Sequence, residues 1–369
     1  MVKGIFVSRS IGRGEMKKMT ILTVVLSFSV LACFVSQASV SLPDRPAHHT
    51  KSGFKNLDET GEHRGFGSAL RWLLGLAPKE TPPIPPDEVP PYAPEIVPPD
   101  LDLIHHPDPA RIQITWIGQA SFLIQVDGLN ILTDPVFGDR ISPVSFAGPE
   151  RKAPPGIPFN DLPRIDAVLI SHNHYDHLDK PTIKNLGNKP RYFVPLGLQG
   201  WFAALRISRV SQLDWGQTSF IGGVLFHAVP AQHFSGRGPF SFDRELWAGW
   251  VIETKQGNIY FAGDSGYASH FNDIGRRFGP IRLSLLPLGA YRPRWFMRPM
   301  HIDPAEAVLA HQDLGSALSV GMHWGTFKQT EEPLGEPPIY LRKAMREAGL
   351  RPEEFLVMKF GQTLVLDRR

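Results

Sequence analysis

Residues 167–177 read Ala167-Val168-Leu169-Ile170-Ser171-His172-Asn173-His174-Tyr175-Asp176-His177. The apolar residues at the start predict a short buried strand, and three histidines and an aspartate follow it within six positions. A cluster of neutral histidines has no source of stability comparable to that of a bound metal ion. The stretch therefore predicts a metal-binding loop at the end of a buried strand.

The spacing within this loop predicts two ions. Residues two positions apart in an extended segment point the same way, so His172 and His174 can bind one ion. The turn that follows directs Asp176 and His177 toward a second ion. Asp264 lies in the small-residue run AGDSG, which lets its carboxylate approach both ions and bridge them. The complete set of further ligand candidates, each placed after a later predicted strand, is His233, Asp264 and His323.

Predicted strands and helices alternate around the loop, which favours an α/β sandwich of two sheets faced by helices. The predicted strands are Ile112–Ile117, Ser121–Val126, Leu129–Thr133, Ala167–Ile170, Tyr192–Val194, Val224–Val229, Gly249–Glu253, Ile259–Ala262, Leu283–Leu286 and Ala317–Gly321. The predicted helices are Pro181–Leu186, Gly197–Leu205, Pro304–Gln312 and Ile339–Ala348.

The metal loop, followed by isolated His, Asp and His, resembles the metallo-β-lactamase superfamily. The flanking segments are similar to one branch of it, the N-acylphosphatidylethanolamine-hydrolysing phospholipase D family. These segments are LTDPVF (Leu132–Phe137), SHNHYDHLD (Ser171–Asp179), GAYRPRWFM (Gly289–Met297), HIDPAEAV (His301–Val308) and HWGTF (His323–Phe327). The resemblance covers roughly Phe66–Leu366 and implies a four-layer αβ/βα sandwich, two zinc ions and a homodimer.

The same resemblance assigns the ligands. It implies that one zinc is bound by His172, His174 and His233, that the other is bound by Asp176, His177 and His323, and that Asp264 bridges them. Without it, His233 also fits an ordinary loop histidine and Asp264 an ordinary turn residue, and the role of His323 is open in the same way. The ligand set itself accommodates manganese or iron as well as zinc.

Further side chains are expected around the metals. Asp134, after the strand Leu129–Thr133, is expected to orient a ligand histidine rather than to bind metal. His301 is expected to contact the substrate, with a place beside a helix N-cap as the competing role. Asp264 and His301 are therefore the catalytic candidates. The candidates for substrate binding are Arg292 and Arg294 for phosphate, and Trp295, Phe296 and Met297 for acyl chains, the alternative being core aromatics beside surface arginines.

Two adjacent metal ions activate water, so the expected activity is hydrolysis. The resemblance implies a zinc-dependent phospholipase D-type phosphodiesterase that cleaves N-acylphosphatidylethanolamine or a related glycerophospholipid to phosphatidic acid and an N-acylethanolamine. The alternative is a dizinc hydrolase of a lactone, a β-lactam or a non-lipid phosphodiester. Cys33 is the only cysteine, so no thiolate ligand of the kind found in some β-lactamases is available.

Composition excludes other classes. The chain has 369 residues, 42% of them hydrophobic, with 39 basic and 36 acidic side chains. This balance indicates a globular protein without the basic surplus that collects nucleic acid. We therefore expect a phospholipid substrate and a membrane surface as partners, and no nucleic acid.

The N-terminal part predicts export. Residues 1–40 contain an uncharged apolar run after Lys17 and Lys18, which is typical of a signal peptide or a membrane anchor, with Met1 or Met16 as the start. Cleavage after Ala38 or lipidation of Cys33 are the alternatives to an uncut anchor, and each predicts a bacterial cell envelope location, periplasmic or lipid-anchored. Residues 41–99 predict a short helix (Phe66–Leu76) and a proline-rich linker, and residues 100–369 the catalytic domain.

Overall fold

The structure is a computed structural model, and it describes residues 46–58, 67, 68, 71, 76, 80–144, 146–238 and 241–368. The expected export segment, with Cys33 and both candidate start residues, lies outside these residues, as does most of the expected helix at Phe66–Leu76. Within the described ranges, no helix combines the length and the apolar character that crossing a membrane requires.

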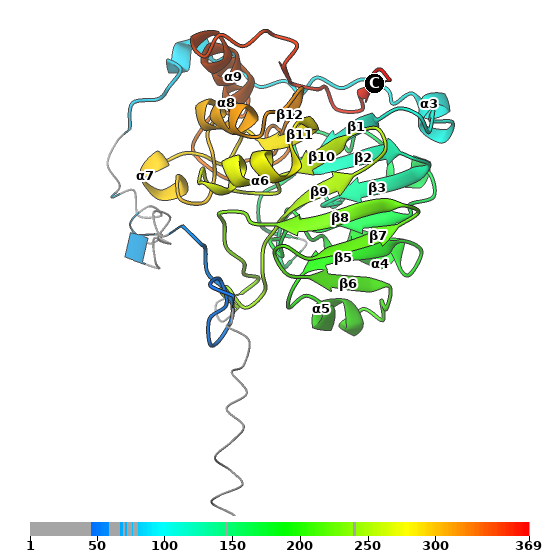
Figure 1. Ribbon diagram of the computed structural model, residues 1–369. Coiled ribbons are helices and arrows are strands. Elements are labelled where there is room, and N and C mark those ends of the chain that lie inside the picture. Colours follow the sequence, from blue (N-terminus) through cyan, green and yellow to red (C-terminus); the bar gives the residue numbers. More distant parts are fainter. Residues whose placement is uncertain are drawn as a thin grey trace, which may run out of the picture. The chain divides into compact units, whose positions relative to one another are not determined.

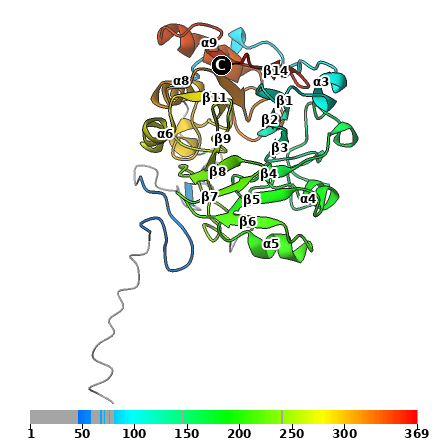
Figure 2. The same ribbon diagram turned by 45° about the vertical axis from the view of Figure 1, so that its right-hand side comes forward.

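The first sheet has the strand order β14-β1-β2-β3-β4-β5-β6 (Figures 1 and 2). Strands β14, β1, β2 and β3 are antiparallel neighbours, and β3 to β6 run parallel. The bounds are β1 (Gln113–Gly118), β2 (Ser121–Val126), β3 (Leu129–Thr133), β4 (Ala167–Leu169), β5 (Arg191–Pro195), β6 (Val210–Leu213) and β14 (Thr363–Val365).

The second sheet has the order β13-β12-β11-β10-β9-β8-β7. Its strands β10 to β13 are parallel, whereas β7 to β10 are antiparallel. The bounds are β7 (Thr218–Ile221), β8 (Val224–Val229), β9 (Gly249–Glu253), β10 (Asn258–Phe261), β11 (Ile281–Pro287), β12 (Ser319–Met322) and β13 (Phe355–Leu356).

The two sheets face each other across an apolar core. Successive side chains of a strand point to opposite faces, and both faces of β5 are buried. Phe193 points inward and stacks on Phe226 of β8, with ring centroids 4.3 Å apart. Its neighbours Tyr192 and Val194 point to the outer face. This alternation joins the two sheets into one sandwich.

Helices cover both outer faces, so the molecule has the four layers that the resemblance implies (Figures 1 and 2). Ile183 of α4 and Phe202 of α5 pack on the outer face of the first sheet, and α8 packs on β11 of the second. The helices are α3 (Leu101–His105), α4 (Lys180–Leu186), α5 (Gln199–Ala204), α6 (His270–Phe278), α7 (Arg294–Met297), α8 (Pro304–Asp313) and α9 (Glu336–Glu347), with 3-10 turns η2 (Pro86–Glu88) and η3 (Phe159–Asp161).

The proline-rich residues belong to the same packed unit, which spans His48–Arg369. Tyr92 donates its hydroxyl hydrogen to the carbonyl oxygen of Gly325 at 2.7 Å, and Ile96 pairs with Phe360. The boundary expected at residue 100 therefore marks a change of composition, while packing contacts reach back to His48.

Candidate metal centre

The predicted metal loop follows β4 at the sheet edge where parallel strands β3 and β4 both end. Arg237 holds this loop from outside. Its Nη1 donates to the carbonyl oxygens of Asn173 at 2.7 Å and Leu178 at 2.8 Å, and its guanidinium lies 4.0 Å from the ring centroid of Tyr175. Nothing in the sequence near Arg237 pointed to this role.

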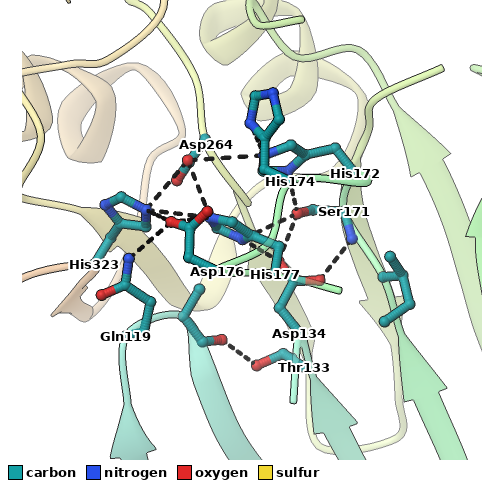
Figure 3. A network of polar contacts seen from close by, with 12 residues as sticks. Gln119, Thr133, Asp134, Ser171, His172, His174, Asp176, His177, Asp264 and His323 are labelled. Atoms are coloured by element: carbon teal, nitrogen blue, oxygen red, sulfur yellow. Dashed lines mark hydrogen bonds and ion pairs between the residues drawn. The ribbon is translucent and has the colours of Figure 1, made fainter. Parts of the chain in front are cut away.

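The second sheet supplies the remaining ligand candidates to the same place, and Figure 3 shows two of them, Asp264 and His323, beside the loop. His233 follows β8, Asp264 follows β10 and His323 follows β12. The structure therefore brings together all seven predicted ligands, from both sheets. They form two groups of converging atoms, His172, His174 and His233 in one, and Asp176, His177, Asp264 and His323 in the other.

The first group consists of three imidazoles. Nδ1 of His174 lies 2.8 Å from Nε2 of His172 and 3.3 Å from Nε2 of His233. His172 and His233 are fully buried. Their Nδ1 atoms are bonded elsewhere, to the Ser171 hydroxyl at 2.9 Å and to the Met300 carbonyl at 2.9 Å. These bonds leave each Nε2 facing the shared centre.

The second group contains two imidazoles and two carboxylates. Nε2 of His323 lies 3.0 Å from Oδ2 of Asp176 and 3.1 Å from Nε2 of His177. Oδ2 of Asp264 lies 3.0 Å from Nε2 of His177 and 3.2 Å from Nε2 of His323. All four side chains are buried.

Asp264 stands between the two groups. Its Oδ2 is 3.9 Å from Nε2 of both His172 and His233, in addition to its short contacts in the second group. Its buried Oδ1 has no hydrogen-bond partner in the described part of the chain. This is the position expected of a bridging carboxylate.

The turn that carries Asp264 requires a glycine before it. Gly263 has a φ of +61°, and a Cβ added there would lie 2.5 Å from Cβ of Ser171. Ser171 itself connects the sheets, because its carbonyl oxygen accepts from the backbone N–H of Ala248. The turn before Asp264 therefore packs directly against the side chain of Ser171 and leaves no room for a side chain of its own at Gly263.

Asp134 lies where the sequence predicts it, behind a ligand. One of its oxygens accepts from Nδ1 of His177 at 2.6 Å, and the other accepts from the backbone N–H of Ser171 at 2.7 Å. The carboxylate thus fixes the tautomer of His177 and leaves Nε2 to bind metal.

Two glutamines hold the ligand Asp176, and sequence reasoning missed both. Nε2 of Gln119 donates to Oδ2 of Asp176 at 3.0 Å, and Nε2 of Gln329 does so at 2.9 Å. Gln119 lies in the turn between β1 and β2, and Gln329 follows the HWGTF segment. Only their proximity to Asp176 in space identifies them.

The protonation of the histidines differs between the two groups. Burial lowers the pKa of His172 and His233 well below the usual value, and it lowers the pKa of His174 to about 4. Burial acts in the same direction on His177 and His323, but neighbouring carboxylates outweigh it. The pKa of His177 is raised well above its usual value, and that of His323 to about 9.

The donor set fits divalent cations. Ligand atoms bound tetrahedrally at about 2.0–2.1 Å lie roughly 3.3 Å apart, and the closest separations within the two groups, 2.8 to 3.3 Å, are near that value. Neutral imidazoles and ionised carboxylates are the forms that bind metal, so a cation bound by His177 and His323 displaces the protons that their raised pKa values favour. Burial opposes ionisation of Asp176 and Asp264, yet their histidine neighbours hold the pKa of both well below the usual range. The residues present therefore fit a two-metal site.

His301 borders this site. Its Nδ1 is buried without a hydrogen-bond partner among the described residues and lies 3.9 Å from Oδ2 of Asp264. Burial lowers its pKa to about 4. Asp303 caps α8 in a reciprocal arrangement with Glu306, so His301 also lies two residues before a helix N-cap, the place that the competing role gives it.

The structure pairs the two arginines expected to bind phosphate with glutamates. Arg292 is bound to Glu336 at 3.2 Å, and Arg294 is bound to Glu306 at 2.6 Å. Both glutamates are buried, and a buried carboxylate needs such a partner. Arg292 and Arg294 therefore neutralise interior charges. The other predicted substrate residues lie on α7, where Phe296 and Met297 join an apolar cluster and the ring of Trp295 lies 5.6 Å from that of Phe296.

Known sequences resemble this chain over its central part. A sequence model of the β-lactamase superfamily domain matches residues 129–324. N-acyl-phosphatidylethanolamine-hydrolyzing phospholipase D 1 of Caenorhabditis elegans is 39% identical over 263 residues, which make up 67% of this chain and 74% of that protein. The mitochondrial N-acyl-phosphatidylethanolamine-hydrolyzing phospholipase D of Saccharomyces cerevisiae is 34% identical over 247 residues, 64% of this chain and 52% of that protein.

A solved structure shows the same fold. A possible metal-dependent hydrolase from Veillonella parvula matches with a TM-score of 0.58, over 69% of this chain and 100% of that one. The two sequences are 16% identical, so this likeness concerns the arrangement of sheets and helices.

Proposed function

Because the chain belongs to the metallo-β-lactamase superfamily, and within it to the family of N-acylphosphatidylethanolamine-hydrolysing phospholipases D, we propose that this metal-dependent hydrolase is a zinc phosphodiesterase of phospholipids. Its proposed substrate is N-acylphosphatidylethanolamine or a related glycerophospholipid. The products are phosphatidic acid and an N-acylethanolamine.

An apolar surface beside the metal ligands, here called the apolar wall, is the observation that favours a lipid substrate. The ring of Phe234 lies 4.4 Å from that of the ligand His174, and 6.3 Å from that of Phe242, which is 64% exposed. A lipid substrate needs such a surface next to a polar reaction centre. Phe234 and Phe296 also pack against the buried apolar cluster of Ala290, Met297 and Met300.

Two zinc ions bound by the seven ligands would supply an activated water and neutralise phosphoryl charge. Around them, the chain has to orient the attacking water. The Oδ1 atom of Asp264 suits this role, since it is ionised, buried and without a partner among the described residues. Asp264 then accepts a hydrogen bond from the water and aligns it with the phosphorus.

His301 is the second group that contacts the substrate in this proposal. Its imidazole is neutral near pH 7, because burial lowers its pKa to about 4. A neutral ring can donate a hydrogen bond from one nitrogen without adding charge beside the metals. His301 thus orients the phosphodiester against Asp264, 3.9 Å away.

The location and partners complete the proposal. An exported chain, held at the cell envelope by its apolar N-terminal segment, would meet phospholipid at a membrane surface. The exposed Phe242 lies on the apolar wall and suits contact with such a surface. The homodimer that the resemblance implies belongs to the same proposal.

The test is product analysis in ¹⁸O-labelled water. Full-length protein loaded with zinc is incubated with N-acylphosphatidylethanolamine in mixed micelles, with a chelator-treated sample as control. We expect chelator-sensitive release of N-acylethanolamine, with one ¹⁸O atom in the phosphatidic acid, because water attacks phosphorus and the ethanolamine oxygen leaves with a proton.

The His301→Gln variant separates substrate contact from metal binding. We expect it to retain its zinc and to lose activity by about 10²- to 10⁴-fold, as for a group that acts on the reacting atoms. A metal-loaded wild-type protein that releases no N-acylethanolamine would contradict the lipid substrate. Parallel assays with a lactone, a β-lactam and a non-lipid phosphodiester would then identify the substrate class.

A further inference from the structure

The ligand His233 lies on irregular backbone. It falls between the end of β8 at Val229 and the start of β9 at Gly249, and the described residues of this stretch form no helix or strand. The bond from Nδ1 to the Met300 carbonyl orients the ring. It does not hold the backbone, and a ligand is held within a fraction of an ångström only if its backbone is held as well.

The side chain of Asn56 holds this backbone. Its Nδ2 donates to the carbonyl oxygen of His233 at 2.9 Å, and its Oδ1 accepts from the backbone N–H of His233 at 3.1 Å. One amide therefore satisfies both backbone groups of one ligand, as a neighbouring strand would. Oδ1 also accepts from Nε1 of Trp247 at 3.0 Å, which orients the amide itself.

The segment that carries Asn56, residues 48–58, is fastened at its start. His48 and His49 bind the two carboxylate oxygens of Asp214 through their Nε2 atoms, at 2.6 Å and 2.7 Å. The ring of His48 also stacks on Trp215, with centroids 4.3 Å apart. Trp215 in turn donates from Nε1 to the carbonyl oxygen of Trp247 at 2.6 Å.

The same segment is fastened near its end. The backbone N–H of Phe54 donates to the carbonyl oxygen of Asp243 at 2.8 Å, and Nε2 of Gln232 donates to that of Asp58 at 3.1 Å. Gln232 is the residue directly before His233. The contacts on both sides of Asn56 therefore bind to the loop that carries the ligand.

We propose that Asn56 is a positioning residue for His233, and that residues 48–58 form a clamp that completes the first metal group. This clamp lies outside residues 129–324, where the superfamily domain matches. The inference rests on the metal site of the proposed function and is independent of the lipid substrate. Its tests therefore measure metal binding in the absence of substrate.

The experiment is a metal titration of the full-length chain. Metal-free wild type, Asn56→Ala and Asn56→Asp are titrated with Co²⁺ and with Zn²⁺ against a competing chelator. Asn56→Asp keeps the acceptor oxygen and the size of the side chain but replaces the Nδ2 donor. It therefore tests the hydrogen bond from Nδ2 to the His233 carbonyl by itself. In both variants we expect the affinity of one of the two sites for its ion to fall by about 10- to 100-fold. The absorption spectrum of Co²⁺ bound at that site should change as well.

Asn188→Ala is the matched control. Asn188 makes the same kind of bonds in a remote loop, donating to the Arg206 carbonyl at 2.9 Å and accepting from the Ser208 N–H at 2.8 Å. It should bind metal as the wild type does. The unfolding temperature of each metal-free variant shows that it is folded.

Two results would overturn the inference while leaving the proposed metal site intact. Equal affinity for both ions in wild type, Asn56→Ala and Asn56→Asp would show that the clamp does not position His233. A loss of equal size in Asn188→Ala would show a general effect of removing a buttressing asparagine. A wild-type chain that binds no divalent cation would contradict the proposed function itself, and the clamp's role with it.

Discussion

At the scale of single residues, the metal centre depends on groups that never touch metal. Asp134 accepts hydrogen bonds from His177 and Ser171, and Ser171 accepts one from His172. Asp134 therefore orients a ligand in each group: His177 directly, and His172 through the hydroxyl of Ser171. Burial raises the pKa of Asp134, and it outweighs the hydrogen bonds from His177 and Ser171, which act in the opposite direction. Loss of these bonds would therefore disfavour the ionised carboxylate further.

Replacing Asp134 by asparagine tests this dependence. The amide has only one acceptor oxygen for three donors, so the tautomer of His177 is no longer fixed. We expect metal affinity to fall by about 10- to 100-fold, measured by chelator competition. Asp166→Asn is the control, because Asp166 accepts from Asn130 and pairs with Arg164 far from the site. Affinity within twofold of wild type in Asp134→Asn would contradict the assignment.

His270 is a second residue with a measurable effect. It is buried against the hydroxyl of Ser265 at 3.1 Å, and burial lowers its pKa to about 3. The unfolded chain, with a pKa near 6.5, then binds a proton that the folded chain rejects. Stability is therefore fully present above about pH 6.5 and is lost as the pH falls toward 3, by about 1.4 kcal/mol per pH unit.

The variant His270→Gln removes this proton-binding difference. We expect the free energy of unfolding of the metal-free wild type to fall by about 2 kcal/mol more between pH 6.5 and pH 5 than that of His270→Gln. Urea unfolding at the two pH values measures it. Parallel losses in the two proteins would show that His270 does not titrate as its burial requires.

At the scale of elements, the strands missed by the sequence prediction are all edge strands. β6, β7, β13 and β14 stand at the ends of the two sheet orders, and residues of β6, β7 and β14 are mostly half-buried or exposed. An edge strand is covered less completely than a central one, so its apolar pattern is weak. The interior strands β2 and β8 coincide with their predicted ranges, because burial on both faces requires long apolar runs.

The turn between β10 and Asp264 supplies a prediction at this scale. In Gly263→Ala, the new methyl group would meet Ser171 at 2.5 Å, in a backbone conformation with φ of +61°. We expect a loss of more than about 1 kcal/mol in the free energy of unfolding, together with loss of bound metal as the two turns separate. Denaturant unfolding and metal analysis measure these effects.

Gly238→Ala is the matched control for this turn. A Cβ at Gly238 meets no atom of the described residues within 4 Å, and Gly238 is not among the residues with positive φ. Its stability and metal content should match those of wild type. Full metal content in Gly263→Ala would show that the turn tolerates a side chain and that its close packing is not needed for the site.

At the scale of the whole molecule, the ligands join the two sheets. His172, His174, Asp176 and His177 follow a strand of the first sheet, whereas the remaining ligands follow strands of the second. A metal bound by both sets would therefore hold the sandwich together at this edge. Such a cross-link adds binding free energy to the stability of the folded chain.

Metal removal should therefore lower the unfolding temperature. A bound ion present at about 1,000 times its dissociation constant adds roughly 4 kcal/mol to the free energy of unfolding, and a chelator should remove this contribution. Scanning calorimetry with and without chelator measures the change. The His172→Ala variant should respond less, and an unchanged unfolding temperature in a preparation that is shown to lose its metal would contradict the cross-link.

The metal loop, the interior strands and the role of Asp134 follow from the sequence by itself. Each depends on residues close together in the chain, where alternation of apolar side chains and spacing of ligands have a direct physical meaning. The metallo-β-lactamase resemblance also rests on such local motifs. These features were sufficient to predict the layered fold and the metal-dependent chemistry.

Only the tertiary structure decided which distant groups meet. Asn56 reaches His233 across 177 positions, and Arg294 pairs with Glu306. Gln119 supports Asp176 from another turn altogether. Hydrogen bonds and ion pairs between such residues leave no local pattern in the chain, because they arise when the folded backbone brings the groups together.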